Sequence, residues 1–289
     1  ALLSARSVPY VPRPSPVRDR MLLAFVLLMS VAMLAVIGMA VFGSFVKVWP
    51  YNLSLTLNHY TYGFEEAGVE NAYRNSLTMA AWCALIGALL TFAGAYWLEK
   101  TRGADLVRPI VRLQAMLPMA IPGLVLGIGY ILFFNHPANP LNVLYGTMGI
   151  LVLSTIVHFY SSSHLTAVTA LKQLDNEFES VSASLKVPFY KTFWRVTVPV
   201  CLPSIIDISR YYFVNAMTTI SAVVFLYSPK TMLAAISIVQ LDEAGAIGSA
   251  AAMATLIVVT SGIVTLLSFA VEGWLLRRTQ GWRRAAPTR

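Results

Sequence analysis

Charged side chains are scarce in this chain. Asp, Glu, Lys and Arg make up only 12% of its 289 residues, whereas apolar residues make up 57%. Soluble domains average about one quarter charged residues. The shortage therefore argues against an ordinary soluble domain and predicts that much of the chain lies in a membrane. Acidic residues are the scarcer charge, with 13 Asp and Glu against 21 Lys and Arg.

Cysteines and catalytic motifs are also few. Cys83 and Cys201 lie far apart in sequence without metal-ligand or redox spacing, which argues against a disulfide framework. The sequence has no G-x-x-x-x-G-K-[ST] motif, and so no glycine-rich loop of the kind that holds nucleotide phosphates. His158 and His164 are six residues apart, which places them on different helix faces, and no H-E-x-x-H motif occurs. We therefore predict no catalytic residues and no metal site.

Six apolar segments are long enough to span a bilayer, which requires about 20 residues of helix. They cover residues 21–46, 75–98, 113–134, 143–160, 204–227 and 246–271. The third and fourth come from one uncharged stretch, which the sequence NHPANP divides because closely spaced prolines cannot continue a helix. Residues 231–241 are apolar but too short to cross, and we expect an interfacial or re-entrant segment there.

Basic residues are distributed unevenly between the two sides of these segments. With six spans, 18 of the 21 Lys and Arg residues fall on the side that holds both chain ends, and only Lys47, Arg74 and Lys230 fall on the other. The positive-inside rule then places both termini in the cytoplasm. Because topology accounts for the basic charge, no separate basic face remains for nucleic acid.

Residues 171–203 form a charged insert between the fourth and fifth segments. Apolar residues three or four positions apart predict one face of a first helix, at Leu171, Leu174, Phe178, Val181 and Leu185. The sequence KVP at residues 186–188 should end this helix. A second short helix would carry apolar and basic faces, formed by Phe189, Phe193 and Val196 and by Lys191 and Arg195. Two interpretations are open at this point: an amphipathic hairpin that rests on the membrane, or a docking element for a cytoplasmic partner.

Residues 174–203, LDNEFESVSASLKVPFYKTFWRVTVPVCLP, resemble the cytoplasmic coupling loop of the permeases of binding-protein-dependent ABC importers. The matching positions are Leu174, Asp175, Glu177, Glu179, Ser184, Leu185, the run 193–196 and Pro199. Three positions depart from the family pattern: Ser180 replaces the signature Glu, Val181 and Ser182 replace an Ala pair, and Lys186 replaces a Gly. A glycine there would supply a positive φ at little cost. Lys186 must therefore either adopt that geometry or form a different turn.

The resemblance implies an all-α membrane protein of the type I ABC importer fold, with six transmembrane helices within residues 21–276 and a two-helix coupling insert at 171–203. Residues 1–20 would be a cytoplasmic arm and 277–289 a basic cytoplasmic tail. The chain would be a transport subunit of the bacterial inner membrane rather than an enzyme, and would itself bind no cofactor.

The same resemblance implies several partners. Separate cytoplasmic ATPase subunits would bind ATP and Mg, a periplasmic protein would deliver the substrate, and a second permease half or copy would complete the pathway. The ATPase-coupling residues would be Glu179, Ser180, Leu185, Lys186, Val187, Pro188 and Phe189. Leu185 and Phe189 would be buried anchors, and Lys186 and Lys191 would pair with acidic ATPase residues.

A narrower resemblance concerns the substrate. The sequences SLKVPFYKTFWRVTVPVCLPSI and RYYFVNAMTTISAVVFLYSP are similar to those of permeases for 2-aminoethylphosphonate, which are related to the ferric-iron type. The resemblance implies import of 2-aminoethylphosphonate or a related phosphonate, with ferric iron, polyamine and sulfate as alternatives within the family. Such permeases are often two fused six-span halves. The Pro- and Arg-rich opening SVPYVPRPSPVRDR would suit the joint before a second half.

Polar residues in the fifth segment are candidates for the translocation path, because polar groups are costly in lipid. Asn215, Thr218 and Thr219 are spaced so as to share one helix face, and Ser221 follows them. The alternative is that these groups only hydrogen-bond neighbouring helices.

Two ionisable residues lie at the start of the same segment. Asp207 and Arg210 are three residues apart, and we expect them to pair at the cytoplasmic end of the fifth span. No ionisable residue falls near the centre of any predicted span. This pattern disfavours a secondary transporter, because that class commonly places its coupling residues at mid-membrane.

Overall fold

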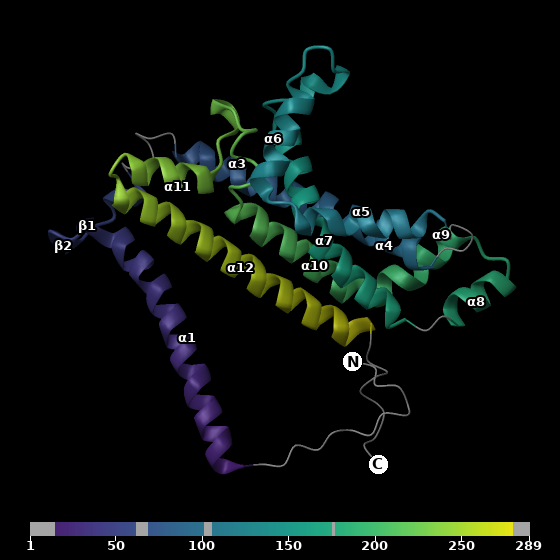
Figure 1. Ribbon diagram of the computed structural model, residues 1–289. Coiled ribbons are helices and arrows are strands. Elements are labelled where there is room, and N and C mark those ends of the chain that lie inside the picture. Colours follow the sequence, from purple (N-terminus) through teal and green to yellow (C-terminus); the bar gives the residue numbers. More distant parts are fainter. Residues whose placement is uncertain (1–14, 62–68, 101–105, 175–176, 280–289) are drawn as a thin grey trace.

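The chain folds into a bundle of long helices with shorter elements at its edges (Figure 1). A computed structural model describes residues 15–61, 69–100, 106–174 and 177–279. Asp175 and most of the predicted arm and tail lie outside these ranges. The long helices are α1 (Pro16–Phe45), α3 (Val69–Trp82), α4 (Ala88–Lys100), α5 (Arg108–Ala120), α6 (Gly123–Phe134), α7 (Met148–Lys172), α10 (Val198–Thr218) and α12 (Ile247–Thr279).

Several of these helices are long and apolar enough to cross a bilayer. Among the described residues, α1, the helix Val69–Lys100 and α12 meet this condition alone, and α5 with α6 meets it as a bent pair. The second is continuous because the π-helical segment η2 (Cys83–Gly87) joins α3 to α4. α7 and α10, with 25 and 21 residues, also have the length for a crossing but contain more polar side chains. Each predicted apolar segment is therefore helical, although several bounds differ.

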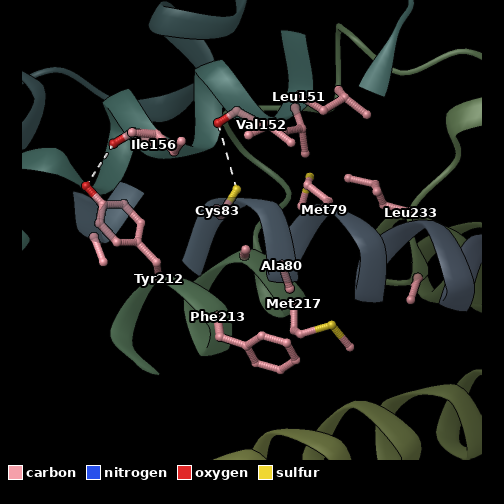
Figure 2. Packing of buried hydrophobic residues seen from close by; sticks show 14 of the residues in the cluster. Met79, Ala80, Cys83, Leu151, Val152, Ile156, Tyr212, Phe213, Met217 and Leu233 are labelled. Atoms are coloured by element: carbon pink, nitrogen blue, oxygen red, sulfur yellow. Dashed lines mark hydrogen bonds between the residues drawn. The ribbon is translucent and has the colours of Figure 1, made fainter. Parts of the chain in front are cut away.

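The core lies where α3, α4, α7 and α10 meet (Figure 2). Tyr212 and Met217 of α10 are fully buried there. The Tyr212 hydroxyl donates to the carbonyl of Ile156 at 3.4 Å and is hydrogen-bonded to the Thr91 hydroxyl at 2.8 Å. Gly87 lets this ring pack closely, because a Cβ on residue 87 would lie 2.9 Å from it. These contacts fix α10 against α4 and α7.

α1 stands apart from this core and contacts mainly α12 (Figure 1). No residue of its most apolar stretch is buried. The chain continues into an antiparallel hairpin of β1 (Val46–Val48) and β2 (Asn52–Leu55), followed by the 3-10 turn η1 (Asn58–Tyr60). A Cβ on Gly248 would come within 2.3 Å of the His59 ring, so η1 packs on the start of α12. The apolar periodicity of the sequence predicts only helices, and this hairpin was not predicted.

The third predicted span is broken near its middle. α5 and α6 are bent by 111° relative to each other, and the break falls at Ile121 and Pro122. Pro122 has no N–H to donate to the preceding turn, and Ile121 has the extended φ and ψ of −100° and 124° that a following proline favours. The predicted third span is therefore bent at Pro122, one of the two prolines in the sequence that can bend this helix. α6 ends at Phe134, and the 3-10 turn η3 (Pro140–Leu144) leads to α7 as predicted.

The fifth helix begins and ends earlier than predicted. It starts with α9 (Phe189–Thr192), passes through the π-helical segment η4 (Phe193–Thr197) and continues as α10. It stops at Thr218 because Thr219 is extended, with ψ of 136°. Adjacent β-branched residues weaken a helix at this point, and residues 221–226 form turns instead. The second helix of the predicted insert is thus the first part of the fifth helix.

The first insert helix is shorter than predicted. α7 extends to Lys172, so Leu171 is fully buried at its end and Leu174 follows in a turn. The insert helix itself is α8 (Glu177–Ser184). The prediction of a single helix was wrong because the apolar spacing continues across a turn between two helices, through Leu171, Leu174, Phe178, Val181 and Leu185.

The short apolar segment near residue 235 forms α11 (Ala234–Glu243), after the 3-10 turn η5 (Pro229–Thr231). Its ten residues are too few for a crossing, as predicted. The Ala234 N–H donates to Ser76 Oγ at 2.8 Å, which holds α11 against α3 (Figure 1).

Candidate functional site

The insert turns sharply between α8 and α9. Lys186 has a φ of +54° and, among the described residues, is the one non-glycine position with a positive φ. The Val187 N–H donates to the Ser182 carbonyl at 2.9 Å, which is the 6→1 bond of a Schellman helix end. Pro188 then caps the start of α9. Lys186 therefore adopts the geometry that a glycine would adopt with less strain.

The base of the insert is attached to α4. The Phe193 ring lies 4.7 Å from the Tyr96 ring and 6.0 Å from the Phe92 ring, centroid to centroid. On the other side of the insert, Lys100 Nζ donates to the carbonyl of Leu174 at 3.4 Å. Because all three α4 residues lie within its last three turns, movement of either end of the insert is passed to α4.

A hollow of about 810 Å³ lies between α8 and the helix that starts with α9. The hydroxyls of Ser182 and Thr192 contact each other across it and join the two helices. Its described lining consists of apolar side chains, two hydroxyls and three cations, and it includes no acidic side chain. The lining residues are Phe178, Val181, Ser182, Leu185, Lys186, Val187, Pro188, Lys191, Thr192, Arg195 and Val196.

The tip of the insert exposes large apolar side chains, and α8 lies away from the bundle (Figure 1). Leu185 is 70% exposed and Phe189 is 69% exposed. Contiguous exposed apolar groups mark interaction surfaces. Ser180 is exposed as well. Glu179 lies in α8, but its side chain is not among those that the structure describes.

The predicted translocation residues are not all brought together on one helix face. Asn215 Nδ2 donates to the carbonyl of Tyr211 at 2.8 Å, and the Thr218 hydroxyl donates to the carbonyl of Val214 at 3.2 Å. In these described bonds, both groups contact their own helix rather than a neighbouring one. Thr219 is buried and lies beyond the end of α10. The prediction that it shares a helix face with Asn215 and Thr218 was wrong.

Ser221 lies in the turns that follow α10, beside the break between α5 and α6. A Cβ on Gly123, the first residue of α6, would lie 2.3 Å from Ser221 Oγ and 3.0 Å from His158 Cε1. The Ser154 hydroxyl donates to the carbonyl of Ala222 at 2.8 Å and so satisfies one carbonyl of the turn. Two helix breaks therefore meet at Gly123, with His158 of α7 next to them.

Sequence reasoning did not connect His158 with a site. The Pro-Gly pair at residues 122–123 signals a break in an apolar segment. It carries no information on which distant residues pack against that break. Contact between residues 123, 158 and 221 depends on how two helices and the turns after a third pack together, and the sequence alone does not specify it.

Asp207 and Arg210 form the predicted ion pair, with 2.7 Å between Oδ1 and Nη2. Arg210 Nη1 also donates to Ser268 Oγ at 3.3 Å, and the guanidinium carbon lies 4.3 Å from the centre of the Phe269 ring. α10 begins earlier than predicted, which places this pair near the middle of the helix and not at its cytoplasmic end. The prediction that the pair lies near the start of its helix was therefore wrong. The two charges offset each other, and the pair joins α10 to α12.

Reactive groups are sparse in the described part of the chain. No three His, Cys, Asp or Glu side chains gather there in a way that could hold a metal ion. Cys83 and Cys201 are both buried, and neither is part of a disulfide. Three other features stand out in this part of the chain: the exposed apolar tip of the insert, the contact of the insert base with α4, and the pair of helix breaks at Gly123.

The fold is that of ABC importer permeases of known structure. One such structure, of a bacterial ABC transporter involved in the import of the acidic polysaccharide alginate, matches with a TM-score of 0.72 over 88% of this chain and 96% of that chain, at 17% identity. A second, of the bacterial alginate ABC transporter in complex with alginate pentasaccharide-bound periplasmic protein, gives 0.67 over 90% and 95%, also at 17% identity. The chain is thus an all-α membrane protein of this fold class.

Sequence similarity identifies the family. Residues 91–280 match the model of the binding-protein-dependent transport system inner membrane component. The chain belongs to this family, whose members are transport subunits rather than enzymes, as predicted.

The names of the individual relatives refer to different substrates. The ferric transport system permease protein FbpB of Actinobacillus pleuropneumoniae is 31% identical over 250 residues, covering 85% of this chain and 36% of that protein. The 2-aminoethylphosphonate transport system permease protein PhnV of Salmonella choleraesuis is 24% identical over 220 residues, covering 76% and 81%. The chain spans about a third of the length of the FbpB relatives that it matches.

Proposed function

We propose that the chain is the membrane-spanning permease part of an ATP-driven importer and that its insert receives the ATPase. The observation that carries this proposal is the exposed apolar tip at Leu185 and Phe189, on a hairpin whose base is attached to α4 through Phe193. Apolar side chains of this size are suited to a groove on a partner protein. ATP and Mg would be bound by that partner, which supplies the hydrolysis.

The fifth helix is the element that would transmit the motion. The continuous helix from Phe189 to Thr218 has 30 residues and is about 45 Å long at 1.5 Å per residue. A shift imposed at the tip therefore reaches the far end of α10, where Asn215 and Thr218 lie and where Ser221 meets Gly123. Packed interfaces switch between discrete arrangements rather than deforming continuously. We assign these polar residues to the translocation path on that basis.

We place the insert and both termini on the cytoplasmic side, since most basic residues lie there. A periplasmic substrate-binding protein would dock on the opposite side. The description of the family as binding-protein-dependent supports this partner. A second permease half or copy would cover part of the exposed surface of α1, and the greater length of the FbpB relatives supports fusion to such a half.

We propose ferric iron as the substrate. Identity to the FbpB relative is higher and extends over more of the chain than identity to PhnV. Import of 2-aminoethylphosphonate is the second candidate, favoured by the PhnV relative because this chain covers 81% of its length. Uptake of radiolabelled ferric iron and of radiolabelled 2-aminoethylphosphonate, in cells with and without the gene, distinguishes the two.

The docking proposal is tested by co-purification of the ATPase with single variants of the permease. Leu185→Glu should lower the retained ATPase at least tenfold, because it places a charge where an apolar anchor is required. Leu55→Glu is the matched control, since Leu55 is 73% exposed but lies on the β-hairpin at the other end of the bundle. Normal retention of the ATPase by Leu185→Glu would overturn the proposal.

A further inference from the structure

Three cations line the hollow between α8 and α9 without an ion-pair partner among the described residues. They are Lys186 at the tip turn, Lys191 in α9 and Arg195 in η4. The rest of the described lining is apolar apart from two hydroxyls. Unpaired cations above an apolar surface are complementary to a ligand that is anionic at one end and apolar at the other.

Two of these cations lie near the end of the apolar part of a membrane-spanning helix. The Phe193 ring packs on the Tyr96 ring, so Phe193 lies near the level of Tyr96. The charged end of the membrane-spanning helix Val69–Lys100 begins three residues later, at Glu99. Lys191 and Arg195 are each two residues from Phe193, which is about 3 Å along the helix. Lys191 therefore lies within about one helical turn of the boundary between apolar and charged sequence, and Arg195 lies about one and a half turns from it, on the apolar side.

Exposed aromatic residues mark the same level. Trp194 is 58% exposed and Tyr190 is 52% exposed. Tryptophan and tyrosine are enriched where a membrane protein meets the interface between hydrocarbon and water. Their exposure beside Lys191 and Arg195 is consistent with contact to lipid on this side of the helix.

We propose that this hollow binds an anionic phospholipid, with the phosphate between Lys191 and Arg195 and part of an acyl chain against the apolar lining. A volume of about 810 Å³ is within the range of small-molecule sites. Basic pockets at the cytoplasmic face of membrane proteins attract anionic head groups. Lys186, farther from the membrane, would contact the outer part of the head group.

A segment of the ATPase is the competing occupant. The level of Lys191 and Arg195 favours lipid, because a water-soluble partner would have to enter the interface to reach them. Leu185 also lines the hollow, but it is 70% exposed and Phe189 is 69% exposed, so both side chains remain accessible to the ATPase. A bound lipid would also connect α8 to α9 next to the Ser182–Thr192 contact. The lipid would then brace the tip that the proposed ATPase docking requires.

Fluorescence quenching by brominated lipid tests the site in the full chain, purified without the ATPase. The signal of Trp194 is isolated from the other five of the six tryptophans by subtracting the signal of the Trp194→Phe variant. Mixed micelles carry either brominated phosphatidylglycerol or brominated phosphatidylcholine. We expect stronger quenching by the anionic lipid at equal mole fraction.

Charge removal is the decisive comparison. The double variant Lys191→Gln/Arg195→Gln should lower the affinity for brominated phosphatidylglycerol, obtained from the quenching of Trp194, about 25-fold, at roughly fivefold for each removed charge. Lys191→Arg/Arg195→Lys keeps both charges and should retain the effect, which excludes a general packing defect. Lys172→Gln/Lys230→Gln removes two cations that do not line the hollow and should also retain it.

Two results would overturn the lipid site. Equal quenching by both lipids, in the unmodified protein and in the charge-removal variant, would indicate surrounding lipid without a specific site. Unchanged phosphatidylglycerol binding by Lys191→Gln/Arg195→Gln, together with lost retention of added ATPase, would assign the hollow to the ATPase. Because lipid binding is measured without the ATPase, failure of the lipid site and failure of the Leu185 docking proposal are separate outcomes.

Discussion

The Phe193 ring packs on the Tyr96 ring with 4.7 Å between their centroids. Phe193 belongs to the helix that begins in the insert, and Tyr96 belongs to a membrane-spanning helix. Aromatic pairs at this distance contribute about 0.5–1.5 kcal/mol beyond the area they bury. The contact makes the base of the insert and the end of α4 a single mechanical unit.

Phe193→Ala should separate docking from transport. A buried Phe→Ala change costs about 3–5 kcal/mol; Phe193 is half-buried, and we expect a loss of about 2 kcal/mol in the free energy of unfolding. ATPase binding should persist while uptake falls, because the tip remains but its attachment to α4 is weakened. Trp194→Ala, at a 58% exposed neighbour, is the control for stability and uptake. Equal effects of the two changes would show that the Phe193 contact has no special role.

Lys186→Gly should stabilise the end of α8. A non-glycine residue in the left-handed region costs about 1 kcal/mol or more, and Lys186 has a φ of +54°. Lys186→Ala removes the same charge but keeps the Cβ. The difference in stability between the two variants therefore measures the cost of holding a residue with a Cβ at this positive φ. We expect the glycine variant to unfold at the higher temperature in a thermal melt. Identical melting temperatures would show that the turn carries no such strain.

The sequence predicted where apolar helices occur better than where they end. Apolar residues continue past Thr218 as far as residue 227, yet the helix stops at Thr218. An apolar turn and an apolar helix have the same transfer energy, whereas their backbone hydrogen bonds differ. Here the Ser154 hydroxyl satisfies the carbonyl of Ala222 from another helix, and no local pattern announces that contact.

The candidate site was predictable in part. The KVP sequence correctly indicated a helix end, and the family pattern indicated a turn that favours a positive φ at Lys186. Leu171 was misassigned because the three- and four-residue spacing continues by coincidence from α7 into α8. The meeting of Gly123, His158 and Ser221 was not predictable, because it is a tertiary contact between three separate elements.

Gly123→Ala should disturb the junction of the two helix breaks. Its Cβ would lie 2.3 Å from Ser221 Oγ, and such overpacking costs about 1–3 kcal/mol. We expect uptake to fall severalfold while membrane insertion stays normal. Gly129→Ala, in the same helix with nothing within 4 Å of the new Cβ, should leave uptake unchanged. Ser221→Gly combined with Gly123→Ala should restore part of the loss; equal uptake by Gly123→Ala and Gly129→Ala would contradict the account.

The Asp207–Arg210 pair should show strong energetic coupling. Asp207→Asn and Arg210→Gln each leave one charge without its partner, so each single change should destabilise the protein more than the double change does. A double-mutant cycle on unfolding in detergent should give a coupling of about 1–3 kcal/mol. The exposed pair Glu70–Arg74, at 3.8 Å, is the control and should give about 0.3–0.5 kcal/mol. Additive single changes at Asp207 and Arg210 would show that the two charges are not energetically coupled.

We propose above all that a nucleotide-hydrolysing partner holds the insert tip. A photo-crosslinking residue in place of Leu185, activated in intact membranes, tests it most directly, with the same residue in place of Leu55 as the control. We predict a crosslink from position 185 to an ATPase subunit and none from position 55. Crosslinks from position 185 to lipid alone, in membranes that import the substrate normally, would contradict the account.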